Sequence, residues 1–128
     1  LAKNNLAYLY AEHLPTPENL QQALALINEV LDEAPEDPNV LDTKGWVLCK
    51  MGDYRQAQSY LTQAVEAAPN NPTLKYHLAF CEARLGEIEK AKADLEKLLE
   101  LKINFPERAA AETLLLELRQ QPPGSPQK

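Results

Sequence analysis

The sequence predicts an all-α fold in which pairs of helices repeat along the chain. Small residues recur at a spacing of 34 residues, as Ala23, Ala57 and Ala91 do. Apolar residues follow each of these alanines at helical intervals, and glycines and prolines stand where the helices have to end. A fixed period of this length is typical of helical repeat proteins, in which each repeat is one supersecondary unit.

Four further columns of residues keep the same period. They are Ala11, Gly45 and Ala79; Ile27, Leu61 and Leu95; Val30, Ala64 and Leu98; and Pro35 with Pro69. Within each period, a small residue in a first helical segment is followed 12 residues later by a second small residue, and then by apolar residues on the same helix face. Small side chains allow two helices to approach closely. Each period therefore predicts two antiparallel helices.

Turn signals separate these helices. Gly52 and Gly86 each stand just past an expected helix end, where a left-handed backbone conformation is free of Cβ strain, and each precedes an acidic residue. Prolines at positions 35 and 38, and again at 69 and 72, bracket the linkers between periods. In the first period, the segment that starts at Pro15 replaces the glycine turn. We therefore expect the first helix to end early, near His13 or Leu14.

This combination of features resembles the tetratricopeptide repeat (TPR) family. The second period carries the resemblance most strongly, through Gly45-Trp46, Gly52-Asp53-Tyr54, Ala57, Tyr60-Leu61, Ala64 and Ala68-Pro69. The resemblance implies a right-handed superhelical solenoid of three helix–turn–helix repeats, at residues 4–37, 38–71 and 72–105. Ile103 stands where the family has its closing proline, so we expect the last helix of the third repeat to run slightly long.

A seventh helix is expected after the third repeat. Residues 106–119 keep helical apolar spacing around Leu114, and TPR proteins commonly close the C-terminal end with such a capping helix. The tail at 120–128 has no apolar residue to bury, and we expect it to be disordered. At the other end of the chain, Leu6 and Leu9 begin a helix with nothing before it to pack on. Self-association through this N-terminal repeat face therefore stays open.

The composition argues against several classes of function. The net charge of -6 and the pI near 4.9 have the wrong sign for binding a nucleic-acid backbone, and no apolar run approaches the roughly 20 residues of a membrane span. Neither His13 nor His77 lies at zinc-ligand spacing from Cys49 or Cys81, and no glycine starts a phosphate-binding loop. We expect no nucleic-acid partner, no membrane insertion, no metal and no cofactor. The helical register also predicts that both cysteines are free thiols.

The TPR resemblance implies that the first helix of each repeat, the A helix, lines a concave groove that holds peptides or helices. The candidate groove residues are Asn5, Tyr8 and Glu12 in the first repeat, Asn39, Asp42, Trp46 and Lys50 in the second, and Tyr76, His77, Phe80 and Arg84 in the third. Four of them are Tyr, Trp or Phe, the kind of anchor that dominates binding hot spots. For Trp46 and Phe80, packing against neighbouring helices is the open alternative.

The predicted function is a noncatalytic protein–protein interaction scaffold. One TPR subclass grips a C-terminal carboxylate with Lys and Asn, but Tyr8 and Glu12 stand at those places here. Acidic groups repel such a ligand, so the lining favours an apolar or mildly basic peptide. No nucleophile and base are arranged for catalysis, and we expect that the chain is not an enzyme.

Two alternatives stay open for the function. The chain resembles, at residues 4–12 and 41–47, the closing repeats of long bacterial TPR proteins, some of which are envelope-associated and linked to polysaccharide or protein-export systems. It also has the type of segment that serves as the docking arm of a larger enzyme, such as a glycosyltransferase. Both the bacterial cytoplasm and the periplasm stay open as compartments.

Overall fold

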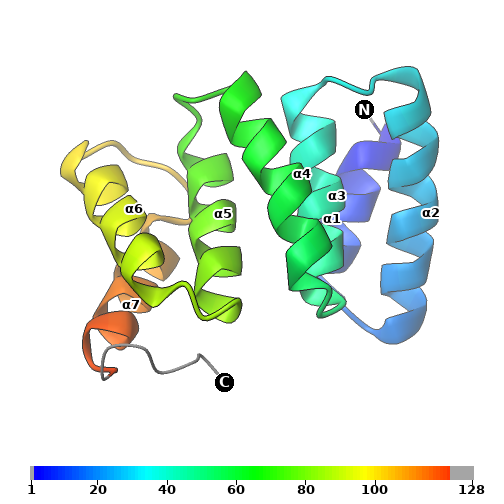
Figure 1. The fold of residues 1–128 in the computed structure, drawn as a ribbon. Coiled ribbons are helices and arrows are strands. Elements are labelled where there is room, and N and C mark those ends of the chain that lie inside the picture. Colours follow the sequence, from blue (N-terminus) through cyan, green and yellow to red (C-terminus); the bar gives the residue numbers. More distant parts are fainter. Residues whose placement is uncertain (1, 122–128) are drawn as a thin grey trace. The chain divides into compact units, whose positions relative to one another are not determined.

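The computed structural model describes residues 2–121, and all regular structure within this range is α-helical. The helices are α1 (Ala2–His13), α2 (Pro17–Glu33), α3 (Pro38–Lys50), α4 (Tyr54–Ala67), α5 (Pro72–Arg84), α6 (Ile88–Glu100) and α7 (Arg108–Arg119) (Figure 1). They form two compact units, with α1 to α4 in residues 1–69 and α5 to α7 in residues 70–128. The all-α prediction is confirmed. The tail expected to be disordered falls on residues 122–128 for its greater part, outside the described residues.

Side-chain caps and prolines start most of these helices. The capping residues, whose side chains accept a hydrogen bond from a backbone N–H of the first turn, are Thr16, Asp37, Asp53 and Asn71. Proline occupies the first turn of α2, α3 and α5, where the backbone N–H that it lacks has no helical partner. The linkers read from the sequence are therefore helix starts with a defined chemistry.

The two glycine turns have the expected backbone conformation. Gly52 and Gly86 have φ angles of 88° and 83°, and their N–H groups donate to the carbonyls of Cys49 and Ala83 at 3.0 and 3.1 Å. Glycine adopts this left-handed conformation without strain. Each turn thus joins two antiparallel helices, and α1 ends at His13, as predicted.

The expectation that the last helix of the third repeat runs long is wrong, because α6 ends at Glu100. Lys102 has a φ of 55°, which is outside the right-handed helical range. The Arg108 guanidinium donates to the carbonyl oxygens of Leu99 and Ile103, at 3.2 and 3.0 Å. These bonds satisfy carbonyls near the helix end, so the helix stops without a proline.

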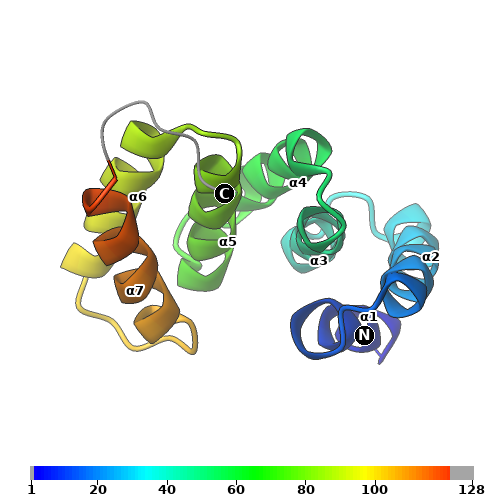
Figure 2. The same ribbon diagram turned by 90° about the horizontal axis from the view of Figure 1, so that it is seen from below.

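The first unit depends on close contacts between helices. A Cβ atom added at Gly45 of α3 would lie 2.6 Å from Leu61 Cγ and 3.3 Å from the Ala57 carbonyl oxygen, both on α4. Ala57 and Leu61 are fully buried. The α1–α2 contact likewise buries small side chains, including Ala11 and Ala23 (Figure 2). The period seen in the sequence therefore marks the contact lines between paired helices.

The second unit is a helical pair covered by a third helix. Ala91 and Leu95 of α6 are fully buried, and α7 packs on both α6 and α5. The Thr73 hydroxyl of α5 donates to Glu107 Oε1 at 2.6 Å, which ties the start of α5 to the residue before α7. Leu118 of α7 is fully buried. These contacts confirm the predicted capping helix.

Two remaining sequence features agree with the structure. Cys49 and Cys81 are buried free thiols, as predicted. In the described range 2–121, no helix is long and apolar enough to cross a membrane.

Replacing Ala57 by leucine should destabilise the first unit by about 1–3 kcal/mol, because the larger side chain cannot fit against Gly45 of α3. Thermal melting followed by circular dichroism measures the change. Ala67→Leu is the matched control, since Ala67 is exposed on the same helix and should tolerate leucine. Equal melting temperatures for the two variants would contradict the α3–α4 contact.

Candidate peptide-binding surfaces

The candidate residues of the first unit form one connected cluster on α1 and α3. The Tyr8 hydroxyl donates to Glu12 Oε2 at 3.0 Å, and Glu12 Oε1 lies 3.9 Å from Lys50 Nζ. Lys50 Nζ in turn lies 5.0 Å from the centroid of the Trp46 ring, a cation–π contact. Because α1 packs against α3, four of the predicted site residues come together here.

Burial divides the roles within this cluster. Trp46 is only 2% exposed, so its ring is packed into the protein and Lys50 covers one of its faces. Glu12 and Lys50 have side chains that are 26% and 27% exposed and are accessible to a ligand. Of the two interpretations that the sequence leaves open for Trp46, its burial supports packing.

The other candidates of the first unit lie apart from a ligand-ready surface. Asn5 and Asn39 are exposed, and the Asn39 backbone N–H donates to the capping residue Asp37 at 2.8 Å. Asp42 is 5% exposed. On α1, Leu6 and Leu9 are 40% and 49% exposed, as the sequence indicates for a helix with nothing before it.

The second unit contains a cleft between α5 and α7. Its volume is about 410 Å³, and its lining consists of Tyr76, Phe80 and Arg84 of α5 with Ala109, Ala110, Thr113, Leu114 and Glu117 of α7. The rings of Tyr76 and Phe80 are tilted by 56° with centroids 6.3 Å apart, and the Arg84 guanidinium lies 4.9 Å from the Phe80 centroid. The cleft therefore has an aromatic wall on one helix and mostly small side chains on the other.

The residues of this cleft differ in accessibility. Phe80 and Arg84 are partly exposed, whereas Tyr76 is 8% exposed. The fourth candidate of this helix, His77, is fully buried beside Tyr76 and does not line the cleft. Phe80 is thus the most accessible aromatic side chain of the cleft.

The five α7 residues of the cleft are absent from the candidates that the sequence supplied. A signal for them exists, because Pro106 follows Pro72 by 34 residues. Extending the period once more pairs Tyr76 with Ala110 and Phe80 with Leu114, the residues that meet across the cleft. The capping helix therefore starts as a further A helix would.

The described part of the chain shows no arrangement for metal-dependent chemistry. No group of three or more His, Cys, Asp or Glu side chains within residues 2–121 is placed to hold a metal ion. The arrangement offers apolar and aromatic contacts with a few charges, which suits binding rather than catalysis.

Paired antiparallel helices that repeat along the chain define the class of α-helical repeat proteins. A family model described as "Tetratricopeptide repeat" matches residues 48–115. That match spans more than half of the chain, and the chain belongs to the tetratricopeptide repeat family. The TPR fold is generally a noncatalytic one.

Solved structures of TPR proteins share this fold. The TPR2B domain of yeast Sti1, in complex with an Hsp70 peptide, is 21% identical with a TM-score of 0.75, over 95% of this chain and 100% of that chain. The first TPR of Spaghetti (RPAP3), bound to an HSP90 peptide, is 19% identical with a TM-score of 0.73, over 93% of this chain and 92% of that one.

A third structural relative is part of an enzyme. An O-GlcNAc transferase mutant from Thermobaculum terrenum is 22% identical with a TM-score of 0.74. The match covers 91% of this chain but only 22% of that enzyme. A comparison with curated protein sequences found no match.

Replacing Trp46 by alanine should destabilise the chain by about 3–5 kcal/mol, the usual cost of truncating a buried large aromatic residue. Urea denaturation followed by circular dichroism measures the loss. Phe80→Ala is the comparison, because Phe80 is partly exposed and its truncation should cost clearly less. A smaller loss for Trp46→Ala than for Phe80→Ala would show that Trp46 is not a packing residue.

Proposed function

We propose that this chain is a noncatalytic scaffold that binds a peptide or a partner helix on its A-helix surfaces. In this proposal the α5–α7 cleft makes the main contact, and the Tyr8–Glu12–Lys50 cluster of the first unit is a second contact. The repeats at residues 4–37, 38–71 and 72–105 supply one A helix each, and the cap at 106–119 supplies the far wall of the cleft. Structural relatives in complex with peptides support the binding of a peptide.

The observation that carries the proposal is the chemistry of the cleft walls. Phe80 presents a partly exposed ring next to Tyr76, and the exposed methyl groups of Ala109 and Ala110 leave room opposite that ring. An apolar side chain of a partner fits such a space, and aromatic walls of this kind give large binding energies for a small area.

Charge at the cleft indicates the character of the partner. Glu117 is exposed at the cleft, while the Arg84 guanidinium lies over the Phe80 ring. A basic side chain of the partner can pair with Glu117, and the net charge of -6 favours its approach. We therefore infer that the partner segment carries an apolar residue with a Lys or Arg nearby.

A specific observation also supports the alternative of a docking arm. The likeness to an O-GlcNAc transferase covers 91% of this chain but a small part of that enzyme, so a TPR segment of this kind occurs beside a catalytic region. In that case the chain still acts by binding, and the same cleft positions a protein for chemistry performed elsewhere.

A displayed library of random 12-residue peptides provides the test of the proposed cleft. Enriched peptides should carry an apolar residue near a Lys or Arg, and Ala110→Arg should weaken their binding at least about 30-fold, because the long side chain fills the cleft. Isothermal titration calorimetry measures the affinities.

Leu116→Arg is the matched control for this experiment. Leu116 is exposed on the same helix but does not line the cleft, so the same added charge should leave affinity within about twofold. Circular dichroism verifies that both variants keep their helicity. Equal affinities for the two variants, or no enriched peptide at all, would rule out the cleft as the binding site.

A further inference from the structure

Glu82 of α5 is a fully buried carboxyl group that the proposed binding function does not use. Within the described residues, no donor forms a well-directed hydrogen bond with either of its carboxyl oxygens. The ammonium of Lys90, on α6, lies 3.3 Å from Glu82 Oε2, but the Lys90 side chain is 61% exposed. A buried carboxylate with only an exposed counterion is costly, because it loses its hydration without full compensation.

A second carboxyl group faces Glu82 from the same helix as Lys90. Asp94 of α6 is in hydrogen-bond contact with Glu82. Two ionised carboxylates are both acceptors, so this contact needs a proton on one of them. Burial and the contact with Asp94 raise the pKa of Glu82 to about 8, against a lowering effect of the Lys90 ammonium. The two carboxyl groups therefore titrate as a pair.

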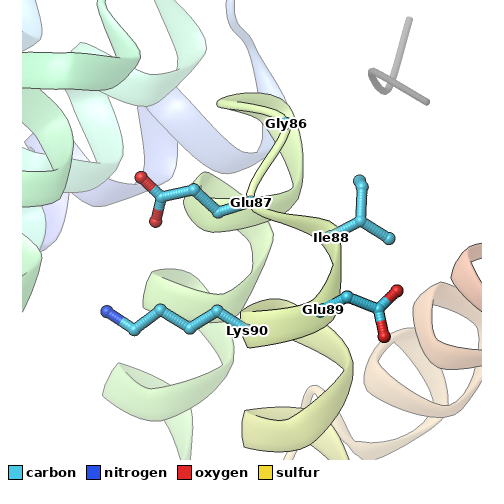
Figure 3. Close-up of a pocket in the computed structure, with 5 residues that line it drawn as sticks. All are labelled: Gly86, Glu87, Ile88, Glu89 and Lys90. Atoms are coloured by element: carbon cyan, nitrogen blue, oxygen red, sulfur yellow. The ribbon is translucent and has the colours of Figure 1, made fainter. Parts of the chain in front are cut away.

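The remaining charges around the pair come from the α5–α6 turn. Figure 3 shows the crevice at this turn, with Glu87 and Lys90 extending to one side and Glu89 to the other. Glu87 acts on Lys90 and, together with Glu82, raises the pKa of that ammonium. Among the described residues, neither α7 nor any other group of α5 contributes to the pKa shift of Glu82.

We propose that a proton shared between Glu82 and Asp94 holds α6 against α5, and that this helical pair loosens as the pH rises. In the unfolded chain the Glu82 carboxyl has its ordinary pKa of 4.5, so the folded state binds the extra proton above that pH. The stability that the proton supplies is complete below pH 4.5 and is lost as the pH rises to about 8. Above that pH, Lys90 compensates only in part, because an exposed ion pair contributes little.

Carboxyl-carbon NMR on the full chain provides a direct test. The Glu82 resonance should titrate with a midpoint near pH 8. Amide protection in α5 and α6, corrected for the intrinsic exchange rate, should fall between pH 5.5 and pH 8.5 by up to about tenfold per pH unit. In Glu82→Gln, which donates to Asp94 without ionising, the corrected protection should stay constant over this range.

Glu89→Gln is the matched control, because Glu89 is an exposed carboxylate on the same helix and pairs with Lys92. This variant should keep the pH profile of the original chain. A Glu82 midpoint near pH 4.5, or the same loss of protection in Glu82→Gln, would overturn the proposal. If Glu82→Gln does not fold, the titration midpoint of the original chain decides alone.

Discussion

The close approach of paired helices is the constraint on which the rest of the structure depends. At the α3–α4 contact, Gly45 lies so near Leu61 that even a methyl group at position 45 would clash. The corresponding contact of the second unit is made by small residues too, Ala79 and Ala91, both buried. Two helices can pack this tightly only where one of them presents almost no side chain. Small residues therefore recur with the repeat.

This contact also determines which side chains remain for binding. In the second unit, one face of α5 is committed to α6, and another turns Tyr76 and Phe80 toward α7. Ala109 and Ala110 lie opposite and are too short to fill the space in front of those rings. The cleft is thus a consequence of where the small residues of α7 fall. The binding surface and the helix packing arise from the same spacing.

Local chemistry made the helices predictable from the sequence. Gly52 and Gly86 mark turns because a positive φ favours glycine, and the early end of α1 follows from the prolines after it. The end of α6 was not predictable in this way. It depends on Lys102 in a conformation that is unusual for its residue type and on bonds from Arg108, nine residues beyond Leu99.

The site was only partly predictable, because burial depends on packing between helices. Phe80 and Arg84 were found from their position on the A helix, but the α7 wall was missed because the period was not extended to Ala110. The burial of Trp46 requires knowing what covers its ring. Glu82 gave no signal, since a glutamate within a helix is most often solvated, and only the fold places it opposite Asp94.

The central claim is that ligands bind between α5 and α7, and chemical-shift mapping with a library-selected peptide tests it most directly. In the isotope-labelled chain, the Ala109 and Ala110 methyl signals and the Phe80 ring signals should shift on saturation, with transferred contacts from the peptide to the same groups. Shifts confined to the outer surfaces of α2, α4 or α6, with the Ala109, Ala110 and Phe80 signals unmoved, would contradict the claim.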